Sequence, residues 1–186
     1  MARTETDIFE TEAADFTRLK LVVAILMGAY FLWATAHPAD WRPIDGVNLV
    51  MHEAGHVVFR PFGEFLMIAG GSLFQVIVPA VFASYFLFNK NNYASALILF
   101  WAGESVLNVS VYAADSVEMQ LPLLGGNDSI HDWNYMLDQL GLLWQTGKIA
   151  FAIRALGTLA ILFALFWAIY SARRSRRQPV PSGILT

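Results

Sequence analysis

The chain has 186 residues, of which 56% are hydrophobic and only 15% are charged, and its net charge at pH 7 is −3. The length predicts a single domain, and a soluble protein of this size could not bury so much apolar surface, so we expect lipid to cover part of it. The sequence contains no cysteine, which excludes disulfides, thiolate zinc sites, cysteine nucleophiles and cysteine-ligated clusters.

Charged residues gather at the two ends of the chain. An acidic N-terminal tail covers residues 1–17, and a basic C-terminal tail, which we expect to be disordered, covers residues 173–186. A basic tail beside an apolar helix is typical of a cytoplasmic membrane anchor rather than of a nucleic-acid patch. We therefore predict no nucleic-acid partner and assign residues 18–172 to a helical transmembrane domain.

Four apolar runs are long enough to cross a bilayer, which takes about 20 helical residues. A shorter segment between the first two runs, residues 44–59, predicts a helix of about 22 Å, too short for a full crossing. The sequence therefore predicts an all-α polytopic integral membrane protein with about four transmembrane helices plus a short helix that dips into the membrane. The four runs cover residues 19–36, 65–88, 94–114 and 149–172.

Prolines indicate where the short helix begins and ends. Pro43 is suited to the first helical position, and Asp45 is suited to the N-cap. Arg60 precedes Pro61, and because a residue before proline avoids helical geometry, we expect the helix to end there.

Basic residues predict the orientation in the membrane. Arg18, Lys20, Lys90 and the C-terminal arginines should lie inside by the positive-inside rule, so the number of crossings must be even. Four spans satisfy this rule if the short helix does not cross. We expect an integral protein of the bacterial inner membrane, with cytoplasmic N- and C-termini and with the short helix and the loop 115–147 on the outer side. The lipid bilayer is then its first partner.

The short helix contains the motif His52-Glu53-Ala54-Gly55-His56. Histidines four residues apart project from one helical face, and this spacing suits two ligands of Zn²⁺. In such HExxH sites the glutamate binds no metal and takes a proton from the metal-activated water, so Glu53 is the candidate catalytic base. The alternative is a polar cap of two histidines at the membrane interface. The apolar neighbours favour the metal site, because ionisable groups in a membrane are costly and usually functional.

A third metal ligand is required, and the outer loop offers candidates. His131 is preferred, and the neighbouring Asp132 or Asp128 could orient or replace it. Asp115 is the best carboxylate candidate elsewhere, as a ligand or as the hydrogen-bond partner of a ligand histidine. The alternative for the His131 segment is a helix start, with Asp128 or Ser129 as its first residue. The predicted metal ligands are His52, His56, His131 and Asp115.

Polar residues also recur along the third apolar run. Glu104, Asn108, Tyr112 and Asp115 follow one another at spacings of four, four and three, which places them on one helical face. Such a stripe in a membrane helix normally faces the protein interior or a watery cavity. We expect Glu104 to be a hydrogen-bonded structural group. Gln75 in the second run could contribute to the site, but a role in joining helices is preferred.

In these motifs the chain resembles the membrane-embedded zinc metallopeptidases of the site-2 protease type, and more closely a bacterial branch grouped with them. The resemblance covers about residues 45–145 and implies that His52 and His56 bind the metal and that Glu53 is the catalytic base. Site-2 proteases take their third ligand from an Asp-Gly pair on a later helix. No Asp-Gly pair follows residue 56 here, so the third ligand cannot be transferred. The resemblance rests on the segments 52–56, 70–75, 112–115 and 131–133.

The sequence thus predicts a membrane-embedded zinc metallopeptidase, a hydrolase of peptide bonds whose substrates are peptides or membrane proteins. The alternative is a non-catalytic, metal-bearing structural subunit of a larger membrane complex, for example a respiratory or photosynthetic one. Haem ligation is disfavoured, because His52 and His56 on one helical face cannot bind opposite faces of a haem.

Overall fold

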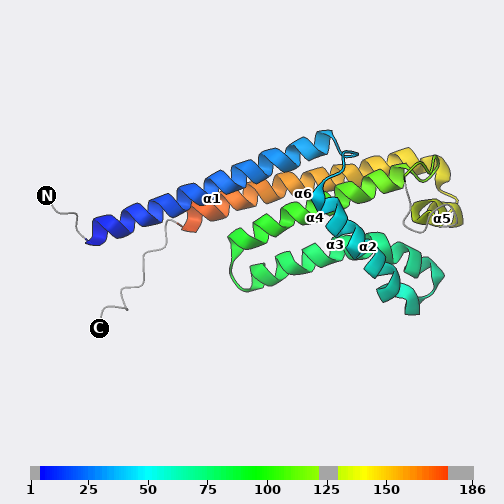
Figure 1. Ribbon diagram of the computed structural model, residues 1–186, viewed down its shortest axis with the longest axis horizontal. Helices are drawn as coiled ribbons and strands as arrows, with labels where there is room; N and C mark the ends of the chain where they lie inside the picture. Colours follow the sequence, from blue (N-terminus) through cyan, green and yellow to red (C-terminus); the bar gives the residue numbers. More distant parts are fainter. Residues whose placement is uncertain (1–4, 122–129, 176–186) are drawn as a thin grey trace.

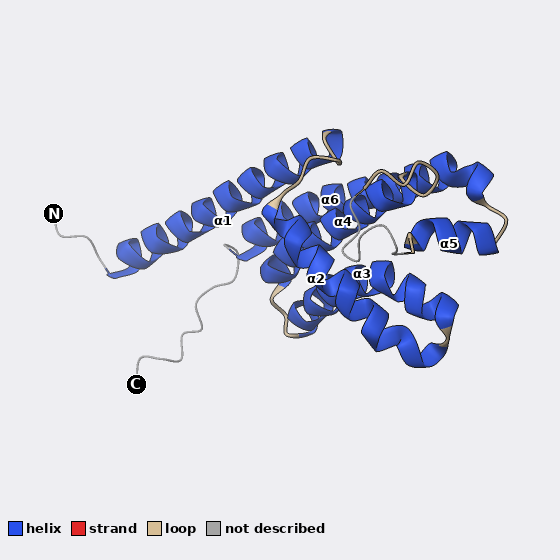
Figure 2. Ribbon diagram, turned by 45° about the vertical axis from the view of Figure 1, so that its right-hand side comes forward, coloured by secondary structure: helices blue, strands red, loops and turns tan. Residues whose placement is uncertain are grey.

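The computed structural model describes residues 5–121 and 130–175. Within these residues every regular element is a helix and none is a strand (Figure 2). Four helices are long and apolar enough to cross a membrane. The prediction of an all-α polytopic membrane protein is therefore confirmed. The four long helices are α1 (Glu5–Ala36), α3 (Glu64–Phe88), α4 (Asn92–Ala114) and α6 (Thr146–Ser175).

Each predicted span lies inside one of these helices, but the helices at the ends of the chain are longer than the spans. Helix α1 already begins at Glu5, so residues 5–17, set apart above as an acidic tail, are helical and continuous with the first span. Helix α6 begins at Thr146 and includes the first residues of the basic tail. The disorder predicted for that tail lies, from residue 176 on, outside the described residues.

The short helix α2 (Pro43–Phe59) is inclined to the long helices, and a 3₁₀ turn, η1 (Arg60–Phe62), follows it (Figure 1). Its first and last residues confirm the boundaries predicted from the prolines. The predicted N-cap is wrong: Arg42 is the N-cap, and Asp45, three residues later, accepts the Arg42 backbone N–H through Oδ2 at 2.6 Å. This bond still satisfies a helix-start donor, because a carboxylate at the third helical position can reach back to the N-cap.

Helix α4 lies at the centre of the bundle and packs against α3 on one side and α6 on the other. The approach to α6 is close because Gly103 and Gly157 face each other: a Cβ added to Gly157 would lie 2.9 Å from the Gly103 carbonyl oxygen. Large apolar side chains of α1, α3 and α6 point outward instead, such as Leu26, Phe82 and Phe166. Small residues between helices and large ones outside are what a lipid environment favours.

The two ends of the bundle differ in what they carry. Glu5 and Ser175, the first and last described residues, lie at one end, as an even number of crossings requires (Figure 1). The opposite end carries the segment after α4, with the short helices α5 (Asp132–Gln139) and η3 (Leu143–Gln145). Which end faces the cytoplasm stays a prediction.

Candidate metal centre

Glycines bring α2 into close contact with α3. A Cβ on Gly55 would collide with the carbonyl of Gly70, and a Cβ on Gly70 would lie 2.8 Å from the Gly55 carbonyl oxygen. A Cβ on Gly71 would lie 2.6 Å from Nε2 of His52. The glycines of both motifs therefore let the backbones touch and leave room for the His52 ring.

The two histidines of α2 meet the first residue of α5. His52 Nε2 lies 2.8 Å from Asp132 Oδ2, and His56 Nε2 lies 3.3 Å from the same oxygen. His52 and Asp132 are buried, and His56 is half-buried. The ligand atoms of the three residues all lie within 4.8 Å of one another, so the group could hold a metal ion. We call His52, His56 and Asp132 the metal centre.

Gln75 of α3 determines which nitrogen of His52 faces this centre. The Gln75 amide nitrogen donates to the Ser105 carbonyl oxygen at 3.2 Å and to Asn108 Oδ1 at 3.1 Å. Gln75 Oε1 must then face His52 Nδ1, 3.1 Å away, and accept a hydrogen bond from the N–H group at that position. Nε2 of His52 therefore faces the centre and is the nitrogen that would bind a metal ion.

A backbone carbonyl does the same for His56. Nδ1 of His56 lies 2.9 Å from the Met67 carbonyl oxygen, and since a carbonyl only accepts, Nδ1 carries the proton. Nε2 therefore faces Asp132, as it does in His52. In a metalloprotein such partners hold the tautomer and the ring orientation of the ligand histidines.

Charge complementarity is strong in the metal-free centre. The hydrogen bond that His56 donates to the Asp132 carboxylate raises the pKa of His56 from 6.5 to about 9. Burial alone would raise the pKa of Asp132, but hydrogen bonds from His52 and His56 outweigh burial and hold it below its usual value. The centre therefore contains a carboxylate and, near neutral pH, a proton on His56 that a cation would replace.

Polar contacts with α3 and α4 hold α5 in place. The Asp132 backbone N–H donates to the Tyr112 hydroxyl at 3.2 Å, and the Trp133 ring N–H donates to Ser72 Oγ at 3.0 Å. The Asn134 amide donates to the Ser116 carbonyl oxygen at 2.8 Å. These contacts bring Asp132 to histidines that lie about eighty residues earlier in the chain.

The structure does not bring His131 and Asp115 into the centre. His131 Nδ1 accepts the Asn134 backbone N–H at 3.3 Å, which makes His131 the N-cap of α5, and its Nε2 lies 3.2 Å from Asp115 Oδ2. Both ring nitrogens are thus in use. Asp115 also accepts the backbone N–H groups of Gln120 and Leu121. The third position beside the two histidines is filled by Asp132, named above as a replacement. A helix does begin in this segment, but its first residue is Asp132 and its N-cap is His131, later in the chain than expected. Asp128 and Ser129 lie outside the described residues.

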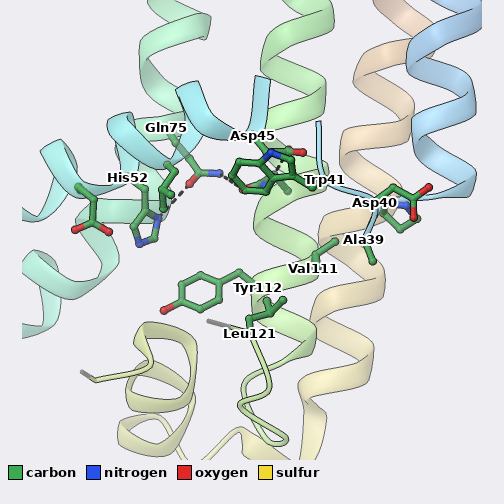
Figure 3. A pocket seen from close by; sticks show the side chains of 13 residues that line it. Ala39, Asp40, Trp41, Asp45, His52, Gln75, Val111, Tyr112 and Leu121 are labelled. Atoms are coloured by element: carbon green, nitrogen blue, oxygen red, sulfur yellow. Dashed lines mark hydrogen bonds between the residues drawn. The ribbon is translucent and has the colours of Figure 1, made fainter. Parts of the chain in front are cut away.

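A cavity of about 220 Å³ opens beside the centre (Figure 3). His52 lies in its wall, and the exposed Glu53 lines it as well, next along α2. Tyr112 of α4 lines it from the side of α5, with its ring centroid 5.6 Å from that of His52. A molecule in this cavity would therefore face a ligand histidine, a carboxylate and a phenol at once. The remaining lining residues include Asp40, Trp41, Leu49, Val111 and Leu121.

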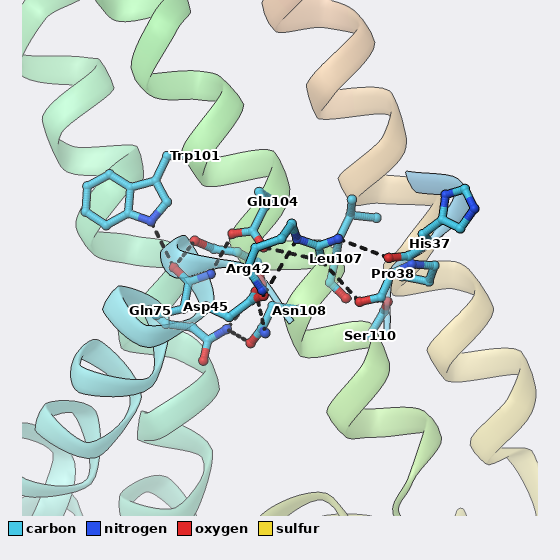
Figure 4. Close-up of polar contacts among 12 residues, drawn as sticks. His37, Pro38, Arg42, Asp45, Gln75, Trp101, Glu104, Leu107, Asn108 and Ser110 are labelled. Atoms are coloured by element: carbon cyan, nitrogen blue, oxygen red, sulfur yellow. Dashed lines mark hydrogen bonds and ion pairs between the residues drawn. The ribbon is translucent and has the colours of Figure 1, made fainter. Parts of the chain in front are cut away.

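A buried polar network supports the centre from behind (Figure 4). Glu104 accepts the Asn48 amide at 2.6 Å, which confirms its expected structural role. Asn108 donates to Asp45 at 3.1 Å and accepts from Gln75, so the network extends to the partner of His52. The sequence does contain a signal for it: four residues at helical spacing form the buried face of α2. They are Asp45, Asn48, His52 and Gly55.

Comparison with known protein families, with curated proteins and with solved structures finds no match to this chain. The function is therefore argued from the geometry of the site, and the resemblance to the site-2 proteases stays a prediction.

Proposed function

We propose that the metal centre binds Zn²⁺ and that the protein is a membrane-embedded zinc metallopeptidase. The observation that carries this proposal is the convergence of two Nε2 atoms on one Asp132 oxygen, with both Nδ1 atoms held by acceptors. Two imidazoles and one carboxylate form a donor set that zinc accepts. Three protein ligands leave a coordination position open, which is the arrangement of catalytic rather than structural zinc sites.

The residues around the cavity fit the hydrolysis of an amide bond. Zinc in such a site supplies Lewis acidity, which activates a water and polarises the scissile carbonyl. Glu53 lines the cavity and accepts the proton of the attacking water, whose oxygen adds to the carbonyl carbon. The C–N bond breaks as that proton passes to the leaving nitrogen.

Tyr112 is suited to stabilise the negative charge that develops on the carbonyl oxygen. Its hydroxyl oxygen accepts the Asp132 backbone N–H, so the hydroxyl proton remains available for a substrate oxygen. The position is fixed by α4 on one side and by the start of α5 on the other, and a donor held in place costs no reorganisation during the reaction.

The metal part of the proposal is tested by metal analysis of the purified protein. Asp132→Ala is expected to lose zinc, whereas the neighbouring His131→Ala is expected to retain it, because His131 is engaged with Asn134 and Asp115. Zinc loss in His131→Ala alone would contradict the assignment of Asp132 as third ligand. An inductively coupled plasma measurement gives the metal identity in the same experiment.

The catalytic part needs a separate variant. Glu53→Gln keeps the shape of the side chain but removes the base, so it is expected to bind zinc as the wild type does and to cleave no peptide. Turnover can be measured with a pool of apolar peptides in detergent micelles, with the products identified by mass spectrometry. Equal product yields from wild type and Glu53→Gln would refute the peptidase and leave a metal-bearing structural subunit.

A further inference from the structure

A second cavity, of about 330 Å³, lies among α1, α6 and the turn between α3 and α4. In the bundle this turn lies at the end away from α5 (Figure 1). The cavity is therefore separate from the metal centre and needs its own explanation. We call it the basic pocket, and its lining residues are Lys20, Lys90, Asn91, Asn92, Tyr93, Ser171 and Arg174.

The lining of the basic pocket is strongly cationic. Lys20 of α1, Lys90 of the α3–α4 turn and Arg174 of α6 contribute three positive charges, and none of the described residues in the lining is acidic. The Lys20 ammonium lies 5.4 Å from the centre of the Tyr93 ring, which also lines the pocket, and 4.5 Å from the centre of the Phe16 ring. Three positive charges that line one cavity attract an anionic group.

A buried hydroxyl in the wall also lacks a partner. Ser171 is only 8% exposed, and within the described residues its Oγ has no hydrogen bond. A buried polar atom without a partner is destabilising, and an oxygen of a ligand in the pocket would supply that partner.

The start of α4 adds backbone donors. Helix α4 begins at Asn92, so the N–H groups of Asn92 and Tyr93 belong to the first turn, where helix geometry provides no intrahelical acceptor. The positive end of the helix dipole points the same way, and together these features form a common phosphate-binding arrangement.

We propose that the basic pocket binds a phosphate group, and that its source is the headgroup of an anionic phospholipid. Large exposed apolar side chains lie close in sequence to the lining residues: Leu19 precedes Lys20, and Phe88, which is 83% exposed, lies two residues before Lys90. A lipid would place its phosphate among the cations and its acyl chains along these side chains. By the positive-inside rule this end faces the cytoplasm, whose leaflet contains anionic lipids.

Native mass spectrometry of the full-length protein in detergent tests the proposal with phosphatidylglycerol and phosphatidylcholine of equal chain length. Wild type is expected to retain phosphatidylglycerol in preference. The double variant Lys90→Gln/Arg174→Gln should weaken this binding about tenfold. The matched variant Arg18→Gln/Arg173→Gln removes two charges at the same end, but from residues outside the pocket lining, and should change binding by less than about twofold. Equal binding of both lipids, or an equal loss in both variants, would overturn the proposal.

Two further arms separate the pocket from its alternatives. Retention of phosphatidylglycerol in millimolar inorganic phosphate supports the lipid as source, whereas its displacement supports the same phosphate site filled by a soluble ion. Ser171→Ala should weaken lipid binding about threefold, with the melting temperature checked for an intact fold, and Ser171→Thr should restore it. Unchanged binding in Ser171→Ala would show that no ligand reaches the buried hydroxyl.

Discussion

Oε1 of Gln75 lies 3.1 Å from Nδ1 of His52, and this single contact between α3 and α2 determines the nitrogen that His52 presents to Asp132. The amide is held in turn by Ser105 and Asn108 of α4. Three helices thus cooperate to orient one imidazole.

Gln75→Leu should therefore weaken zinc binding although Gln75 is not a ligand. The variant removes the acceptor of the Nδ1 proton and leaves the ring free to rotate or change tautomer. Loss of such a partner typically lowers metal affinity about 10- to 100-fold. Competition with a chromophoric chelator measures the affinity. The control is Gln120→Leu. Gln120 is exposed and its side-chain amide donates to the Glu118 carbonyl oxygen, so this variant should leave the zinc affinity unchanged.

Gly71→Ala is expected to disturb the centre by overpacking. The new methyl would lie 2.6 Å from His52 Nε2, so the ring must move away from Asp132. We expect loss of stoichiometric zinc and a destabilisation of about 1–3 kcal/mol. Gly147→Ala is a matched control, because nothing lies within 4 Å of its Cβ position. Full zinc occupancy in Gly71→Ala would contradict the placement of the His52 ring against α3.

Zinc affinity should increase with pH up to about 9. The pKa of His56 is raised to about 9 in the metal-free protein, so below that pH each ion that binds must displace a proton. The apparent association constant should rise about tenfold per pH unit and level off above pH 9. Isothermal titration calorimetry in buffers of different ionisation enthalpy counts the released proton. An affinity independent of pH between 7 and about 9 would contradict the pairing of His56 with Asp132.

The same pKa shift affects the stability of the metal-free protein. The folded-state pKa of His56 lies above its unfolded value of 6.5, so its contribution is fully present below pH 6.5 and is lost as the pH rises through about 9. The melting temperature of the zinc-free wild type should fall over this window. In His56→Gln the fall should be smaller, because the titrating group is gone.

Chelation of zinc should lower the melting temperature of the wild type. Binding only to the folded state stabilises it by about 3 kcal/mol when the free ion is in hundredfold excess over the dissociation constant. The proposed ion would also join α2 to α5, so limited proteolysis should cut the segment after α4 faster once zinc is removed. In Asp132→Ala the chelator should change neither the melting temperature nor the rate of proteolysis. A fall in melting temperature as large as in the wild type would show that the ion binds elsewhere.

Composition and motif predict much of this molecule. The four spans follow from apolar runs of sufficient length. A backbone that crosses lipid has no water to bond with, so it forms a helix that satisfies its own N–H and C=O groups. The ends of α2 follow from Pro43 and Pro61, and two of the three residues that could hold a metal ion follow from the HExxH spacing.

The third residue of the metal centre and the position of Gln75 could not be predicted from the sequence, because contacts between distant segments determine them. His131 and Asp132 are adjacent, and which of them faces α2 depends on the contacts of α5 with Tyr112 and Ser72. No periodicity over so short a helix contains that information. For Gln75 a role in joining helices was preferred over a contribution to the site, but the residue does both, because its register also places it beside His52.

The residues of the metal centre lie on two helices that are held in the structure in different ways. His52 and His56 belong to α2, which packs closely against α3 through glycines. Asp132 belongs to the short helix α5, which lies between α4 and α6 in the chain. The three side chains therefore meet only while α5 is docked against α3 and α4, so a change that displaces α5 would separate the carboxylate from the two imidazoles without altering α2.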